Sequence, residues 1–177
     1  ALDKNLMLIE GDEHTQASRC DLVDSATLQQ IEETVLAVNS ALAVVRSRHA
    51  PTTLLTYPGH YSSSDSLAGQ QVAVLSAIGN PDAFAETVRS LGATVVESRS
   101  LPDHDPYGPE TVCELQAWSE SLASRVSTVI CTHKDLVKLR SDRLGGNPLQ
   151  ALLIDLEILS GEDLIENALA DLVSEIE

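Results

Sequence analysis

The fold is decided by residues 73–107. They read Ala73-Val-Leu-Ser-Ala-Ile-Gly-Asn-Pro-Asp-Ala-Phe84, then Leu91-Gly-Ala-Thr-Val-Val-Glu97, and then Leu101-Pro-Asp-His-Asp-Pro-Tyr107. Residues 71–78 form a short apolar run that ends at Gly79, a pattern typical of a buried parallel strand. The letters that follow predict a tight turn, a helix, a second strand and a loop bracketed by two prolines.

The predicted helix has clear start and stop signals. Asn80 is a good N-cap, and Pro81 at the first helical position loses no hydrogen bond. Apolar residues then recur at the i, i+4, i+7 spacing of one helix face, namely Phe84, Val88 and Leu91. Gly92 is a suitable C-cap, after which residues 93–97 return as a strand. Together these elements predict a βαβ unit, whose functional loops are expected at the carboxyl ends of its strands.

Helices and strands continue to alternate after this unit. The pattern predicts a helix over residues 109–122, a strand over 128–131, a helix over 132–140, a strand over 152–156 and a helix over 161–176. Thr132 and Asp135 are spaced as in a capping box, with Asp in place of Glu. The last helix has an apolar face made of Leu164, Ile165, Ala168, Leu169 and Leu172. This alternation predicts the α/β class: a three-layer, Rossmann-like lobe with a mostly parallel sheet and helices on both faces.

The first 66 residues follow a different pattern. A 3-4 spacing of apolar residues predicts a helix of about six turns and involves Leu28, Ile31, Val35, Val38, Leu42 and Val45. The serine cluster at residues 62–66 predicts a flexible connection and a subdomain boundary. We therefore divide the chain into an unassigned segment (residues 1–17), a connecting region of helix and strand (18–66) and a C-terminal α/β lobe (67–177).

The composition limits the classes of partner. The 177-residue chain has a formal net charge of −16, and a surface of this charge repels nucleic acids and anionic lipids. An aromatic content of 3% also argues against a base-stacking platform, so no nucleic-acid partner is expected. No apolar run approaches the roughly 18 residues of a membrane span, and nothing resembles a signal peptide. Cys20, Cys113 and Cys131 lack metal-ligand spacing and are expected to be reduced cytosolic thiols.

Residues with useful chemistry gather in the predicted loops. His104 stands beside Asp103, and an aspartate can orient a histidine for acid–base work, although a surface turn explains the same letters. The turn at Asn80 can bind an anion at a helix N-terminus or serve only as a tight turn. Lys134 can contact a phosphate or face solvent. The sequence contains no Gly-x-x-x-x-Gly-Lys-Ser/Thr motif, so this chain alone cannot build a P-loop.

Four motifs occur in a specific order. They are Ala77-Ile-Gly-Asn-Pro-Asp-Ala-Phe84, Leu91-Gly-Ala-Thr-Val-Val96, Pro102-Asp-His-Asp-Pro-Tyr107 and Thr132-His-Lys-Asp-Leu-Val-Lys-Leu139. Ser18-Arg-Cys-Asp-Leu-Val23, Ser47-Arg-His-Ala-Pro51 and Ile154-Asp-Leu-Glu-Ile-Leu-Ser-Gly161 fit the same order. In this arrangement the chain resembles the C-terminal half of the tetraacyldisaccharide 4'-kinases, the lipid A kinases, over residues 18–177.

The resemblance implies a kinase of two α/β lobes, in which an N-terminal P-loop lobe binds most of the ATP and Mg²⁺. Its reaction would be ATP-dependent phosphorylation of the 4'-hydroxyl of a tetraacyldisaccharide 1-phosphate, a lipid A precursor, at the cytoplasmic face of the inner membrane. By resemblance, His104 would work with an aspartate of the N-terminal lobe to activate the sugar hydroxyl, and Asp103 would support it. Asn80 and Lys134 would lie near the cofactor in the cleft between the lobes.

The sequence departs from the family pattern in several places. Asp105 stands where the family often has a second histidine, and His133 stands where it often has a glutamate. The P-loop, the catalytic aspartate and the membrane-associating segment are also missing. We therefore expect this chain to be inactive without the P-loop lobe, which is its expected partner together with the lipid substrate and, by resemblance, the membrane surface.

Two other functions fit the residues. A free-standing α/β module could bind a nucleotide or phosphorylated ligand through Gly79, Asn80 and Lys134, and ligand-dependent stabilisation of this chain alone would favour that alternative. A protein-interaction domain could instead use the long helix predicted over residues 28–45. A strictly monomeric chain whose helix is protected from hydrogen exchange would exclude that second alternative.

Overall fold

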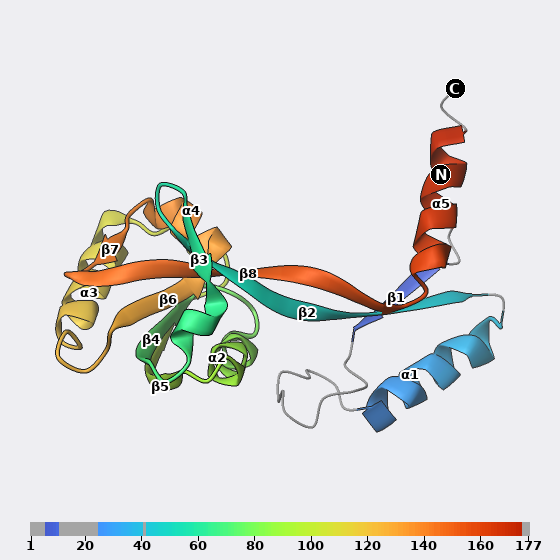
Figure 1. Ribbon diagram of the computed structural model, residues 1–177, viewed down its shortest axis with the longest axis horizontal. Coiled ribbons are helices and arrows are strands. Elements are labelled where there is room, and N and C mark those ends of the chain that lie inside the picture. The colour runs from blue at the N-terminus through green and yellow to red at the C-terminus, as the bar shows by residue number, and fades with distance from the viewer. Residues whose placement is uncertain (1–5, 11–24, 41, 175–177) are drawn as a thin grey trace. The chain divides into compact units, whose positions relative to one another are not determined.

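The computed structural model describes residues 6–10, 25–40 and 42–174, and the chain divides into two compact units (Figure 1). Unit 1 contains Ala1–Ala50 and Asp155–Glu177, and unit 2 is Pro51–Ile154. Two long strands, β2 (Ala43–Thr56) and β8 (Asn147–Ser160), contribute to both units. The domain bounds expected from the sequence, after residues 17 and 66, differ from these and remain predictions.

Unit 2 is an α/β domain. Besides its parts of β2 and β8, it contains β3 (His60–Ser63), a 3₁₀ helix (Ser64–Leu67), β4 (Gln71–Ser76), α2 (Pro81–Ser90), β5 (Thr94–Ser100), α3 (Pro109–Glu120), β6 (Thr128–Thr132), α4 (His133–Leu139) and β7 (Arg143–Leu144). Its strands follow the order β2-β8-β6-β4-β5, and the pairs β8–β6, β6–β4 and β4–β5 are parallel. The predicted class, a mostly parallel sheet with helices on both faces, is therefore confirmed.

The core of unit 2 has two layers, because successive residues of a strand point to opposite faces of the sheet. The layer under α2 contains Val72, Val74, Phe84 and Val88. The layer under α3 and α4 contains Ala73, Leu75, Leu115, Trp118 and Leu136. Burying each large apolar side chain is worth about 1.5–3 kcal/mol, so the continuous apolar run of β4 is what holds helices on both sides.

The predicted βαβ unit is present. The Asn80 side chain accepts a hydrogen bond from the backbone N–H of Ala83 (3.2 Å), and Pro81 is the first residue of α2. Gly92 has φ +82°, a left-handed conformation that favours glycine, and it ends the helix as predicted. The Leu101 N–H donates to the Ser76 carbonyl oxygen (2.9 Å), which joins the carboxyl ends of β5 and β4.

Unit 1 contains β1 (Leu6–Glu10), α1 (Ser25–Val38), its share of β2 and β8, and α5 (Glu162–Ser174). Strand β1 pairs with β2 in parallel. The prediction of one helix through residue 45 is wrong, because α1 ends at Val38 and Val45 is a buried residue of β2. The apolar 3-4 spacing continued by coincidence across the turn at Asn39 and Ser40, where the Leu42 N–H donates to the Asn39 carbonyl.

Two smaller predictions also differ from the structure. The serine cluster is not an irregular connection, since it forms the end of β3 and a 3₁₀ helix that is capped by the Ser63 side chain. Leu169, predicted to face inward, is 55% exposed. Cys20, expected to be a reduced thiol, lies outside the described residues.

The strand order of unit 2 places a topological switch point beside β4. From β4 the chain moves to β5 on one side, and it later returns to β6 on the other. Ligands of open α/β sheets bind outside the carboxyl ends of the strands at such a point. The backbone segments there are residues 77–80 after β4, residues 101–108 after β5, and the first turn of α4 after β6.

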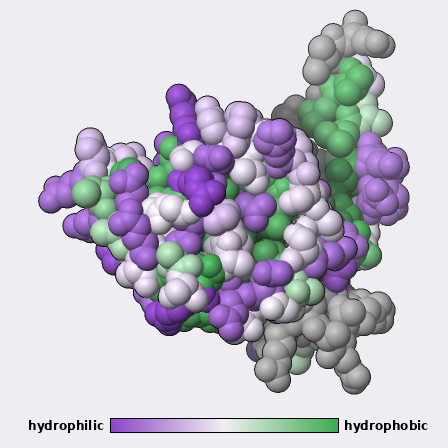
Figure 2. Space-filling view, turned by 60° about the vertical axis from the view of Figure 1, so that its left-hand side comes forward, coloured by the Kyte–Doolittle hydropathy of each residue, from purple (hydrophilic) through white to green (hydrophobic). Residues whose placement is uncertain are grey.

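The surface of unit 2 is mostly polar. Figure 2 shows one face, where hydrophilic and pale side chains cover most of the area and green apolar side chains form small patches between them. The large apolar side chains of unit 2 that are strongly exposed include Tyr57, Tyr61 and Val137. Within the part of the chain that the structure describes, no helix is both long and apolar enough to span a membrane.

Candidate active site

Asp103 and His104 lie on the exposed loop between β5 and α3. The Asp103 carboxylate accepts a hydrogen bond from the backbone N–H of His104 (2.9 Å), and its other oxygen is 3.7 Å from His104 Nε2. His104 has φ +63°, a conformation that non-glycine residues rarely adopt, and its side chain is 77% exposed. The loop therefore presents an imidazole to solvent with a carboxylate beside it.

Lys134 brings a cation to the same carboxylate. It lies in the first turn of α4, and its Nζ is 3.7 Å from Asp103 Oδ1. Both side chains are about half exposed, and such surface pairs contribute only about 0–1 kcal/mol to stability. The importance of this arrangement lies in chemistry and not in stability, because an imidazole and an ammonium flank one carboxylate at the carboxyl ends of β5 and β6.

Asn80 is the fourth residue that the sequence singled out, and it stands apart from the other three. Its side-chain oxygen is used to cap α2, as the bond from Ala83 shows. Among the described residues, no hydrogen bond or ion pair connects Asn80 with Asp103, His104 or Lys134. The structure thus gathers three of the predicted site residues and leaves Asn80 at the neighbouring strand end.

A buried carboxylate, Asp135, supports the first turn of α4. Its Oδ2 accepts a hydrogen bond from the Thr132 hydroxyl (2.7 Å) and one from the Ala77 N–H (3.4 Å). The Thr132 hydroxyl in turn accepts from the Asp135 N–H (3.3 Å), as an N-cap does. The predicted capping pair therefore exists, but the carboxylate bonds to the cap hydroxyl and to the end of β4. Through these two hydrogen bonds, Asp135 links the carboxyl ends of β4 and β6 beside Lys134.

Tyr107 anchors the other end of the Asp103–His104 loop. Its side chain is buried, and burial followed by the charge of Asp135 raises the pKa of its phenol well above the usual value. Its backbone N–H donates to the Asp105 carboxylate (2.7 Å). Lys138 of α4 donates to the Asp105 carbonyl oxygen (2.6 Å), and its Nζ lies 5.5 Å from the centroid of the Tyr107 ring. These contacts hold the loop against α4.

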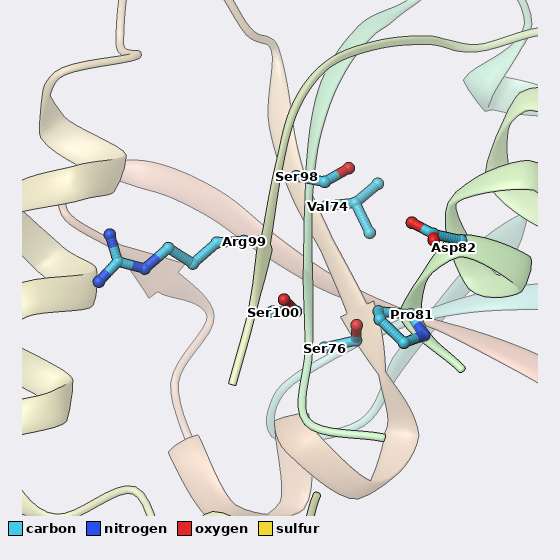
Figure 3. Close-up of a pocket in the computed structure, with 7 residues that line it drawn as sticks. All are labelled: Val74, Ser76, Pro81, Asp82, Ser98, Arg99 and Ser100. Carbon is cyan, nitrogen blue, oxygen red and sulfur yellow. The ribbon is translucent and has the colours of Figure 1, made fainter. Parts of the chain in front are cut away.

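A small pocket lies between β4, β5 and the first turn of α2, with a volume of about 160 Å³ (Figure 3). The Ser76 side chain is 1% exposed, and its hydroxyl has no hydrogen-bond partner among the described residues. Figure 3 shows the Asp82 carboxylate turned toward this space, whereas Arg99 points away from it, toward α3. There Glu114 lies 3.5 Å from the Arg99 guanidinium. The lining thus offers hydroxyls and one carboxylate.

The family resemblance implies ATP and Mg²⁺ as ligands, and the residues of the site fit these two groups differently. No group of three His, Cys, Asp or Glu side chains in the described part of the chain is placed to hold a metal ion. Asp103 has an imidazole and an ammonium as neighbours, whereas Mg²⁺ prefers several oxygen ligands. These residues do not fit a Mg²⁺ site. Lys134 does fit a phosphate of ATP as a point charge.

Comparison with known proteins decides the family. A family model described as tetraacyldisaccharide-1-P 4'-kinase, LpxK, matches residues 11–174. The chain belongs to this LpxK family. The resemblance carried by the four sequence motifs is thereby confirmed.

Curated relatives of the LpxK family show how much of the protein this chain represents. The tetraacyldisaccharide 4'-kinase of Anaeromyxobacter dehalogenans (strain 2CP-C) is 39% identical over 132 residues, which are 72% of this chain and 34% of that protein. The one from Anaeromyxobacter sp. (strain Fw109-5) is 34% identical over 155 residues, which are 86% of this chain and 40% of that protein. The chain therefore spans only about a third to two fifths of the length of these relatives.

A solved structure shares the fold. It is LpxK from Aquifex aeolicus in complex with ATP, with a TM-score of 0.51 and 19% sequence identity. The match covers 94% of this chain and 51% of that one. At this level of identity the likeness supports the fold alone.

Sequence reasoning missed the residues that fix the site in place. Asp135 was predicted only as a helix cap, and Tyr107 and Lys138 received no role. Asp135 and Lys138 are spaced i, i+3 on α4, and Tyr107 closes the proline-bracketed loop, but these letters indicate only one helix face and one loop end. The contact that matters joins residues more than 25 positions apart, so neither helical spacing nor turn chemistry could reveal it.

Proposed function

We propose that this chain is the C-terminal part of an ATP-dependent kinase that phosphorylates the 4'-hydroxyl of a tetraacyldisaccharide 1-phosphate in lipid A biosynthesis. Family membership over residues 11–174 and the names of the relatives support the proposal. The observation that carries it is the gathering of Asp103, His104 and Lys134 at the carboxyl ends of β5 and β6 in a chain of this family.

The geometry suggests a role for each of the three residues. His104, exposed and free to meet a substrate, takes the proton of the attacking hydroxyl as the new oxygen–phosphorus bond forms. Asp103 orients the ring and stabilises the imidazolium that results. Lys134 faces the phosphoryl oxygens with its positive charge, since phosphoryl transfer depends mainly on positioning and charge stabilisation. ATP, when bound, would supply the phosphoryl group: the bond between its γ-phosphorus and the oxygen bridging to the β-phosphate would break, and ADP would leave.

The rest of the catalytic machinery lies outside this chain in our proposal. ATP and Mg²⁺ are held mainly by a P-loop lobe, because this sequence has no P-loop and its described residues form no metal cluster. Asn80 and Lys134 face that lobe across a cleft. The whole enzyme works at the cytoplasmic face of the inner membrane, and this chain by itself does not turn over substrate.

The proposal is tested on the full-length protein that contains this chain. His104→Ala is compared with wild type in a 4'-kinase assay, and His49→Ala, an exposed histidine on β2, is the matched control. We expect His104→Ala to lower kcat a hundredfold or more, as loss of a general base does. The control should keep wild-type kcat, and both variants should melt like wild type. Full activity in His104→Ala would reduce the loop to a structural turn.

A further inference from the structure

A second pocket of unit 2, larger than the first, has no role in the mechanism above. It lies between the tip of the β2–β3 hairpin and α4, two elements that are neighbours in Figure 1, and its volume is about 290 Å³. Buried Leu55 and Leu136 contribute to its lining. Its rim includes Tyr57 and Tyr61 from the hairpin, which are 40% and 68% exposed. The pocket therefore combines an apolar floor with two accessible aromatic rings.

One face of α4 forms the opposite wall. Its pocket-lining residues His133, Leu136 and Val137 follow the i, i+3, i+4 spacing of a helix face. Arg140, the C-cap residue just past the end of α4, completes the lining on this side. Val137 is 53% exposed although it is apolar. The wall is thus shaped for a ligand with an apolar body and a polar, anionic end.

The polar groups around the pocket are available to a ligand. In the described structure, the ring nitrogens of His133 and the hydroxyls of Tyr57 and Tyr61 have no hydrogen-bond partner. The Arg140 guanidinium donates only to the Val137 carbonyl of α4 (3.3 Å) and forms no ion pair with a described residue. Specific sites characteristically place a few such polar groups around an apolar surface.

Charge distinguishes this pocket from the rest of the protein. The chain carries a net charge of −16, yet the lining of this pocket contains two basic residues and no Asp or Glu. A local basic rim on an acidic protein complements an anion and selects against a cation. Arginine is the side chain best suited to a phosphate, because its guanidinium can form two parallel hydrogen bonds with it.

We propose that this pocket binds the phosphorylated sugar of the acceptor, the end of the disaccharide that carries the 1-phosphate. The two tyrosine rings pack against the sugar and the adjoining acyl group, and Arg140 with His133 binds the phosphate. This proposal rests on the proposed function and assigns the substrate a second contact surface. The first turn of α4 joins the two sites, because His133 lines the pocket and Lys134 lies beside Asp103. A disaccharide that reacts at one end and carries a phosphate at the other matches such a pair of sites.

The test uses the full-length enzyme and two acceptors in detergent micelles: the tetraacyldisaccharide 1-phosphate and the same lipid without its 1-phosphate. Arg140→Gln should raise KM for the phosphorylated acceptor roughly tenfold, since a charge-assisted contact to phosphate is lost. With the acceptor that lacks the phosphate, Arg140→Gln and wild type should have equal KM. Tyr61→Ala should raise KM for both acceptors, because it removes contact with the sugar and not with the phosphate.

Arg125→Gln is the matched control, because it makes the same charge change at an exposed arginine that pairs with Glu97 (3.7 Å) outside the pocket. It should leave every kinetic constant unchanged. KM for ATP and kcat should stay within about twofold of wild type in all three variants, as expected when uniform substrate binding is lost. Melting temperatures check that each variant folds.

The results separate the two proposals. An active enzyme whose KM for ATP rises in Arg140→Gln, with KM for the acceptor unchanged, would assign the pocket to the nucleotide and overturn this inference. Unchanged constants in both pocket variants would also overturn it while leaving the kinase activity in place. A wild-type protein without 4'-kinase activity would instead overturn the proposed function, and the inference with it.

Discussion

The two ends of the loop between β5 and α3 differ in their surroundings. At one end, Asp103 and His104 are exposed, and the Asp103 carboxylate lies 3.7 Å from His104 Nε2 and 3.7 Å from Lys134 Nζ. At the other end, Tyr107 is buried and lies against Lys138, and its phenol is influenced by buried Asp135. The groups that can do chemistry are therefore on the loosely held end, and the groups that fix their position are on the buried end. Variants at the two ends should separate activity from stability.

The largest expected effect on stability comes from Asp135→Ala. The change leaves the Thr132 hydroxyl and the Ala77 N–H without their carboxylate partner, and each unsatisfied buried group costs about 1–3 kcal/mol. We expect a loss of roughly 3 kcal/mol in the free energy of unfolding, measured by urea denaturation of this chain. Asp103→Ala is the control at the exposed end and should cost less than about 0.5 kcal/mol. Equal losses of unfolding free energy in the two variants would contradict the idea that the buried end stabilises the loop more than the exposed end.

The next effect is a dependence of stability on alkaline pH. Burial raises the pKa of Tyr107, and burial followed by the charge of Asp135 raises the pKa of Cys131, from ordinary values of 10.0 and 9.0. Above pH 9 the unfolded chain therefore loses protons that the folded chain keeps, so stability must fall as pH rises. Each such proton contributes a slope of up to about 1.4 kcal/mol per pH unit. The slope is measured by urea denaturation between pH 8 and pH 11.

Substitutions show how much of this pH dependence of stability comes from Tyr107. Above pH 10, Tyr107→Phe should reduce the slope of the free energy of unfolding against pH by the contribution of about one proton. The reason is that phenylalanine fills the same space without a titrating group. Tyr61→Phe makes the same chemical change at a side chain that is 68% exposed, and it should leave the slope unchanged. If Tyr61→Phe flattened the curve as much as Tyr107→Phe, the buried environment of Tyr107 would not be the cause.

The difference between local signals and contacts between distant residues explains what the sequence could predict. The βαβ unit was predictable because its signals are local: an apolar run, the Asn80 cap, Pro81 and the Gly92 stop act within a few residues. The position of Asp103 and His104 on a loop beyond a strand was predictable for the same reason. The end of α1 was missed because the apolar 3-4 spacing continues through Leu42 in the turn and Val45 in β2, although the strand is selected by pairing with β1. Pairing across 37 residues has no local signal.

The smallest expected effect tests the two lysines of α4 against each other. Lys138 donates a hydrogen bond to the Asp105 carbonyl and lies over the Tyr107 ring, and each contact is worth about 0.5–1.5 kcal/mol. Lys138→Met should therefore lower the free energy of unfolding by roughly 1 kcal/mol. Lys134→Met, four residues earlier at the exposed end, should lower it by less than about 0.5 kcal/mol, because its pair with Asp103 is half exposed.

Activity should respond in the opposite order. In the full-length enzyme, Lys134→Met removes a charge that we place against phosphoryl oxygens, so its kcat should fall at least tenfold, as loss of a charged transition-state contact implies. Lys138→Met leaves that charge in place and loosens only the anchor of the loop, so its kcat should fall less. If Lys138→Met lost more activity than Lys134→Met, the precision of the loop, and not the charge beside it, would limit the reaction. The buried end would then control catalysis through the position of His104.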